Sequence, residues 1–127
     1  MIVVDASAAV AGLLNAGPAR QALSGERLHA PHLVDPEVAS ALRRGVATSS
    51  IEPGAAWTAL DRWRRLGIER HGVLHLLVRV WELRERLSAY DASYVALAES
   101  LDCALLTADA RLGRAAGLRC PVTVVPR

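Results

Sequence analysis

The stretch Met1-Ile2-Val3-Val4-Asp5-Ala6-Ser7-Ala8 decides the fold that this sequence predicts. Its first half is a short apolar run rich in β-branched residues, which is typical of a buried strand. Ser7 is then expected to cap a helix that continues to Leu14 and ends near Gly17 and Pro18. A strand followed directly by a helix indicates a βα unit, the building block of parallel sheets.

The rest of the chain continues this alternation. Further strands are expected at 27–30, 68–73, 103–107 and 122–125, and further helices at 18–24, 35–45, 49–67, 74–87, 91–101 and 110–116. Asp35 is the expected N-cap of its helix, with Pro36 in the first turn, where a missing N–H is harmless. Because the strands are almost continuously apolar, helices should cover both faces of the sheet. The sequence therefore predicts one α/β domain over residues 1–127, with three layers (α/β/α) around a central, mainly parallel sheet of about five strands.

The composition excludes several classes of protein. At 127 residues and 52% apolar content, the chain suits a single domain. All 15 of its cations are arginine, so no lysine is available for a phosphate-binding loop or for Schiff-base chemistry. Cys103 and Cys120 are too few and too far apart for a zinc cluster, and a reduced cytosolic protein is expected. No membrane association is expected, because Asp5 interrupts the apolar start and no other run has the length of a membrane span.

Four acids stand where an expected strand ends or an expected helix begins. Asp5 closes the first strand, and Asp109 follows the strand 103–107. Glu37 and Asp91 each stand at the head of an apolar helix. In open α/β sheets the functional crevice lies beyond the carboxyl ends of the strands, where the strand order reverses. We therefore expect the four acids to converge at that point.

Four neighbouring carboxylates would raise one another's pKa unless a cation neutralised them. The expected ion is Mg²⁺ or Mn²⁺, because hard divalent cations prefer carboxylate oxygen and water to His or Cys ligands. Ser7 and Thr107 fit the role of caps or turn residues, and in a second interpretation their hydroxyls orient a ligand carboxylate or a metal-bound water.

Each acid also has an ordinary structural explanation. Asp109 before a helix fits an N-cap, worth about 1 kcal/mol, and Glu37 and Asp91 fit first-turn acids that complement a helix dipole. The carboxylate of Asp5 needs a local partner, which Ser7 or a helix N-terminus would provide. It is the joint placement of the acids that indicates a site. The histidines show no paired metal-ligand spacing and are expected to be ordinary surface or core residues: His29, His32, His71 and His75.

Four stretches of the sequence resemble the PIN-domain family, most closely its VapC-type ribonuclease toxins from bacterial toxin and antitoxin pairs. They are Val3 to Ala8, Pro31 to Arg44, Tyr90 to Glu99 and Leu106 to Leu112, and they span essentially the full chain. The resemblance implies a PIN-like fold, Mg²⁺- or Mn²⁺-dependent cleavage of RNA, a homodimer, and a cognate antitoxin that occupies the active-site groove. Residues 48–87 carry no motif, so partner and substrate preference would differ there. The positions that match the acidic quartet of the family are Asp5, Glu37, Asp91 and Asp109.

The resulting hypothesis is a metal-dependent endoribonuclease with Asp5 and Asp91 as the principal ligands. Glu37 and Asp109 would complete or tune the site, directly or through water. A phosphoryl-transfer domain of receiver or phosphatase type also places acids at strand ends, but it relies on a lysine that this chain lacks. The remaining alternative is an inactive PIN-like module that only binds protein or RNA, which loss of an acid would have favoured.

Overall fold

The computed structural model describes all residues from 1 to 127. The elements, in chain order, are β1 (Ile2–Val4), α1 (Ala6–Leu14), α2 (Pro18–Gly25), β2 (Leu28–Pro31), α3 (Val34–Ala47), α4 (Pro53–Arg65), β3 (Ile68–His71), η1 (Leu74–Leu76), α5 (Leu77–Glu82), α6 (Ala89–Ser100), β4 (Ala104–Thr107), α7 (Ala110–Arg114) and β5 (Val122–Val124). Five strands form one sheet in the order β3-β2-β1-β4-β5. The predicted α/β class is confirmed, and the sheet is parallel throughout.

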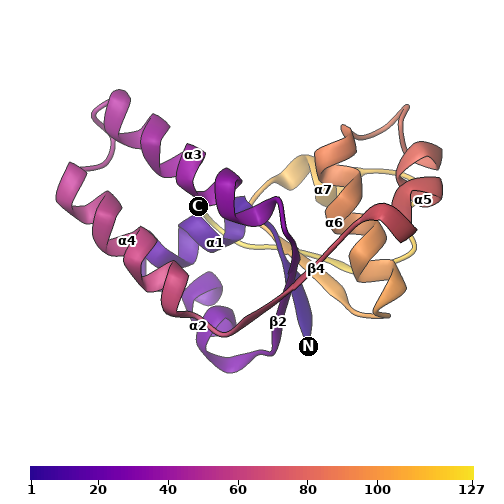
Figure 1. Cartoon of the computed structure of the whole chain (residues 1–127), viewed down its shortest axis with the longest axis horizontal. Coiled ribbons are helices and arrows are strands. Elements are labelled where there is room, and N and C mark those ends of the chain that lie inside the picture. The colour runs from indigo at the N-terminus through magenta and orange to yellow at the C-terminus, as the bar shows by residue number, and fades with distance from the viewer.

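The sheet lies between two groups of helices (Figure 1). Helices α1, α2, α3 and α4 contact one another on one side, whereas α6 crosses β1, β2 and β4 on the other side with α5 packed against it. The central strands supply fully buried residues to this core, among them Val3, Val4 and Leu105. None of the helices combines the length and the apolar character that crossing a bilayer requires.

The strand order reverses at β1. The chain moves outward from β1 through β2 to the edge strand β3, and it then returns to place β4 on the opposite side of β1. Val4 pairs with Leu106, and the backbone N–H of Asp5 continues the ladder by donating to the carbonyl of Leu106 at 3.1 Å. Because the two strands end at the same level, the residues that follow them become neighbours.

Two expected helix caps are wrong. The N-cap of α1 is Asp5, not Ser7, and its carboxylate accepts a hydrogen bond from the Ala8 N–H at 2.9 Å. Helix α3 begins one residue before Asp35, which therefore lies in the first turn. Asp35 instead accepts hydrogen bonds from the Trp63 indole at 2.8 Å and from Arg70 at 2.7 Å. Its side chain thus links α3 to α4 and β3, a tertiary role that local sequence spacing does not predict.

The helix expected at 74–87 is also wrong in its extent. The structure has the 3₁₀ turn η1 followed by the short helix α5, and turns follow Glu82. Leu76 and Val80 reach the core, whereas Val78 and Trp81 remain 78% and 68% exposed. In the sequence, the apolar residues on both faces of this segment suggest one longer helix. In the structure only one of these faces is buried. The other boundaries shift by a few residues; β3, for example, ends at His71.

Close packing of α1 on α2 gives a test of the fold. An added Cβ at Gly12 would lie 2.6 Å from Leu23 Cδ1 and 3.0 Å from the carbonyl carbon of Ala19. The overpacking cost of about 1–3 kcal/mol exceeds the helix-propensity gain of about 1 kcal/mol, so Gly12→Ala should lower the free energy of unfolding in urea. Gly54→Ala is the control, because its Cβ enters open space and should add about 0.5–1 kcal/mol. Equal gains from both substitutions would contradict the observed packing.

Candidate functional site

Asp5 is the most enclosed of the four acids, with 6% of its surface exposed. Ser7 Oγ donates to Oδ1 at 2.7 Å, and Thr107 Oγ1 donates to Oδ2. The Ser7 hydroxyl also accepts a hydrogen bond from the Ala108 N–H at 2.8 Å. These bonds join the start of α1 to the end of β4 and fix both oxygens of the Asp5 carboxylate.

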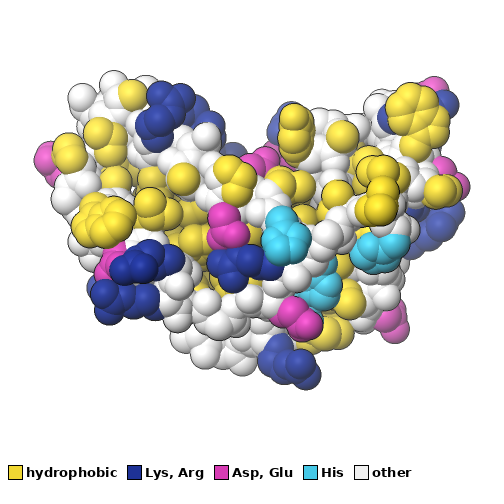
Figure 2. Space-filling model, in the orientation of Figure 1, with side chains coloured by type: hydrophobic (Ala, Val, Ile, Leu, Met, Phe, Trp, Pro, Cys, Tyr) yellow, Lys and Arg dark blue, Asp and Glu magenta, His cyan; other side chains and the backbone are white.

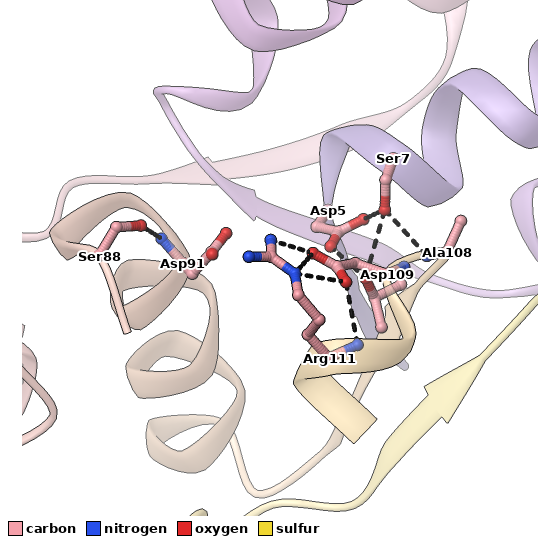
Figure 3. Close-up of polar contacts among 8 residues, drawn as sticks. Asp5, Ser7, Ser88, Asp91, Ala108, Asp109 and Arg111 are labelled. Atoms are coloured by element: carbon pink, nitrogen blue, oxygen red, sulfur yellow. Dashed lines mark hydrogen bonds and ion pairs between the residues drawn. The ribbon is translucent and has the colours of Figure 1, made fainter. Parts of the chain in front are cut away.

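Asp109 is held by its own helix and by one arginine. It is the N-cap of α7 and accepts from the Arg111 backbone N–H at 2.9 Å. The Arg111 guanidinium binds the same carboxylate, with Nη2 2.6 Å from Oδ2 and Nε 3.1 Å from Oδ1. Figure 3 shows the guanidinium between Asp109 and Asp91. The N-cap interpretation of Asp109 is correct, and it coexists with a position beside the other acids.

Glu37 and Asp91 approach Asp5 from helices on opposite sides of the sheet. Glu37 lies in the first turn of α3, where Tyr94 Oη donates to its Oε1 at 2.5 Å. Asp91 lies in the first turn of α6, and its backbone N–H donates to the Ser88 hydroxyl at 3.1 Å. The carboxylate of Asp91 forms no ion pair, since Arg111 binds Asp109, and it faces the groups around Asp5 (Figure 3). Its negative charge is thus available to a ligand.

Three of the four carboxyls resist ionisation. Burial is the main cause that raises the pKa of Asp5, Glu37 and Asp91. Mutual repulsion adds to it, because Asp5 raises the pKa of both Glu37 and Asp91. In contrast, the hydrogen bonds from Arg111 hold the pKa of Asp109 below its usual value. The site therefore concentrates negative charge that one exposed arginine only partly offsets.

The acids face one another without forming a closed ligand cage. They contain no group of three whose ligand atoms all lie within 4.8 Å of one another. Direct coordination by Asp109 together with Asp5 and Asp91 would require Arg111 to turn away from it. This movement is feasible, because the Arg111 side chain is 78% exposed and its ion pair is not enclosed. Carboxylate oxygens are the ligand type that Mg²⁺ and Mn²⁺ prefer, so the donor set fits such an ion.

A groove leads away from these acids. The space-filling view shows a hollow between the two groups of helices, with acidic side chains visible at its floor (Figure 2). A pocket on the side of α1 and α3 includes Ser7 and Glu37 and continues past apolar residues. Its other lining residues include Val10, Leu14, Leu33, Ala41, Arg44, Ile51 and Tyr90. A flexible polymer lying there would reach the acids at one end.

Three features of this region were not predicted from the sequence. Tyr94 had no predicted role, yet its hydroxyl donates to Glu37 and positions that carboxylate. Arg111, two residues beyond Asp109, had no assigned role. The sequence spacing also gives no sign that the ring nitrogens of His29 and His71 lie 2.9 Å apart. This pair depends on the register of β2 with β3, and the short-range spacing of the sequence does not reveal that register.

Comparison with known proteins gives concordant results. The family model for the PIN domain matches residues 2–118. Over 127 residues the chain is 58% identical to VapC ribonuclease Mb0985 of Mycobacterium bovis and to ribonuclease VapC9 of Mycobacterium tuberculosis, with complete coverage of each chain. The crystal structure of PAE2754 from Pyrobaculum aerophilum is similar with a TM-score of 0.72 and 26% identity, covering 95% of this chain and 81% of that one.

Asp91→Asn should raise the melting temperature of the metal-free protein at pH 7. Because folding raises the pKa of Asp91, its contribution to stability is fully present at low pH and is lost as pH rises through the folded pKa. The gain from the substitution should therefore vanish below the ordinary carboxyl pKa of about 4. Thermal unfolding in a chelator across this pH range measures the difference.

Asp61→Asn is the matched control for this charge effect. Arg64 holds the pKa of Asp61 below its usual value, so removing that charge should not raise the melting temperature. If metal-free Asp91→Asn were less stable than the wild type at pH 7, the repulsion among the acids would not be a net cost to folding.

Proposed function

This chain belongs to the PIN-domain family as a VapC-type ribonuclease, and we propose that it cleaves RNA with Mg²⁺ or Mn²⁺ held by Asp5 and Asp91. The observation that carries the proposal is the gathering of Asp5, Glu37 and Asp91 at the point of strand reversal, each with a raised pKa. Folding keeps these carboxylates together despite their repulsion, and a divalent cation would relieve it. All four acids are present, which disfavours the inactive binding module.

In this proposal the four acids form two pairs with different roles. Asp5 and Asp91 are the principal ligands, and Glu37 and Asp109 complete or tune the site directly or through water. A bound divalent ion supplies Lewis acidity, which lowers the pKa of water and offsets charge on the phosphate oxygens. The Ser7 and Thr107 hydroxyls already bind one oxygen each of Asp5, so they orient that carboxylate.

Arg111 is suited to bind the phosphate of the RNA. Its ion pair with Asp109 is exposed on the arginine side, and such pairs contribute little to stability. A phosphate offers the planar guanidinium the same two-point hydrogen bonding as a carboxylate. When Arg111 turns towards RNA, Asp109 becomes free to contribute to the metal site. Movement of Arg111 from Asp109 to the phosphate thus couples substrate binding to completion of the acidic site.

We also propose that a cognate antitoxin silences the enzyme by occupying the groove beside α1 and α3. The groove combines apolar residues such as Val10 and Leu14 with Arg44, and it reaches the acidic site at Ser7 and Glu37. A peptide that buries apolar side chains there would exclude RNA. Arg44 near the same groove would attract an acidic group of that peptide.

The proposed homodimer would use an exposed apolar face. Leu74, Val78 and Trp81 project from η1 and α5, and each is at least 68% exposed. Clustered exposed apolar residues of this kind mark interaction sites in soluble proteins. This face lies in the segment 48–87, where family motifs are absent from the sequence.

Asp5→Asn and Asp91→Asn should each lower RNA cleavage more than about 100-fold, beyond the loss typical for a residue that only supports a metal ligand. Each removes a charged oxygen ligand while keeping the side-chain volume. The assay uses the purified chain freed of antitoxin, an RNA substrate and Mg²⁺ or Mn²⁺, with chelator as the metal-free arm. Circular dichroism checks that the variants stay folded.

Asp61→Asn serves as the control, because Asp61 lies on α4 in an ion pair with Arg64, and it should cut RNA at the wild-type rate. Wild-type cleavage by either site variant would refute the ligand assignment. Undiminished cleavage in chelator would refute the metal requirement.

A further inference from the structure

A second cluster of metal-ligating side chains lies on the two outer strands β2 and β3. His29 Nδ1 is 2.9 Å from His71 Nε2 and 3.2 Å from Glu69 Oε2. The three ligand atoms all lie within 4.8 Å of one another. No other group of three or more His, Cys, Asp or Glu side chains in the chain converges this closely.

The parallel register builds this cluster on one face of the sheet. His29 pairs directly with Glu69, and His71 follows two residues later on the same strand. Alternation along β3 places Arg70 on the opposite face, where it binds Asp35 of α3. The cluster therefore faces the side of α5 and α6.

The spacing of these ligand atoms is close to what a shared cation requires. A tetrahedral ion with metal–nitrogen bonds of about 2.0–2.1 Å separates its ligand atoms by about 3.3 Å, which the 3.2 Å between His29 Nδ1 and Glu69 Oε2 matches. The 2.9 Å between the two imidazole nitrogens is a hydrogen-bond distance, and it would open by about 0.4 Å around the ion. A single proton on His29 Nδ1 can bond well to only one of its two neighbours. Burial also lowers the pKa of His29, which favours the neutral imidazole that metals bind.

We propose that His29, Glu69 and His71 bind one transition-metal ion, with Zn²⁺ as the best match, and that this ion clamps the edge strand β3 to β2. Two imidazoles and one carboxylate form a recognised zinc ligand set that leaves one position for water. His29 is 4% exposed, whereas the Glu69 side chain is 63% exposed. The buried ligand fixes the site and the exposed ligand gives the ion a route in.

The two sites should select different ions. The acidic site offers only carboxylate oxygen, which suits Mg²⁺ and Mn²⁺, whereas imidazole ligands suit Zn²⁺ and related metals. They also lie on different elements. Asp5 and Asp109 follow β1 and β4, Glu37 and Asp91 lie on α3 and α6, and the proposed zinc ligands lie on β2 and β3. Zinc binding can therefore be measured without any assay of RNA cleavage, and either proposal can fail while the other stands.

The test is a Zn²⁺ titration followed by calorimetry and thermal unfolding. To remove binding at the acids, the full chain carries Asp5→Asn and Asp91→Asn. It should bind one Zn²⁺, and a concentration 100-fold above Kd should raise the melting temperature by about 8 °C. Co²⁺ in place of Zn²⁺ should give the strong visible absorption of a four-coordinate site.

One variant should weaken this response and a second should remove it. Glu69→Gln alters an exposed side chain and should weaken Zn²⁺ binding more than about tenfold, and His71→Ala should abolish the melting shift. His32→Ala is the control. His32 is exposed and lies on the opposite side of the sheet from the cluster, where it lowers the pKa of Asp35 electrostatically. The Zn²⁺ binding of this variant should match that of the parent. Absence of Zn²⁺ binding by the parent would overturn the proposal, and so would parent-like binding by both Glu69→Gln and His71→Ala.

Discussion

The parallel pairing of β1 with β4 is the constraint on which the acidic site depends. The register aligns Val4 with Leu106, and the Asp5 N–H extends the ladder by one further hydrogen bond. Both strands therefore end at one level, and their helices α1 and α7 start side by side. Asp5 caps the first of these helices and Asp109 caps the second. Backbone geometry thus brings together two acids that are more than 100 residues apart in the sequence.

The helices on the two faces then bring a third and a fourth acid to the same place. Glu37 enters from α3 and is held by Tyr94 of α6, so one hydrogen bond joins the two helical layers above the strand ends. Asp91 enters from the first turn of α6, and its carboxylate forms no ion pair. The raised pKa values show that folding opposes these charges. A site that needs a metal ion and a polyanionic substrate would explain why the fold keeps these charges despite the free energy that their repulsion and burial cost.

The sequence predicted those parts of the fold and site that depend on local pattern and strand ends. The predicted strand ranges overlap all five observed strands, although β3 (Ile-Glu-Arg-His) is not an apolar run. Acids just beyond two of the strands could be placed at the strand reversal. The N-cap role of Asp35 was wrong because Trp63 and Arg70, distant in the chain, bind its carboxylate. The pairing of His29 with His71 depends on the register of β2 with β3, which no short-range spacing encodes. The role of Arg111 depends on its rotamer, which composition cannot specify.

We propose that Asp5 and Asp91 hold a divalent ion at the reversal of strand order. The most direct test is to soak crystals of the antitoxin-free protein in Mn²⁺, because anomalous scattering locates the ion independently of any activity. A peak is expected within about 2.0–2.3 Å of carboxylate oxygens of both Asp5 and Asp91, with Arg111 turned away where Asp109 also coordinates. A peak bound elsewhere, or no peak at a saturating concentration of Mn²⁺, would contradict it.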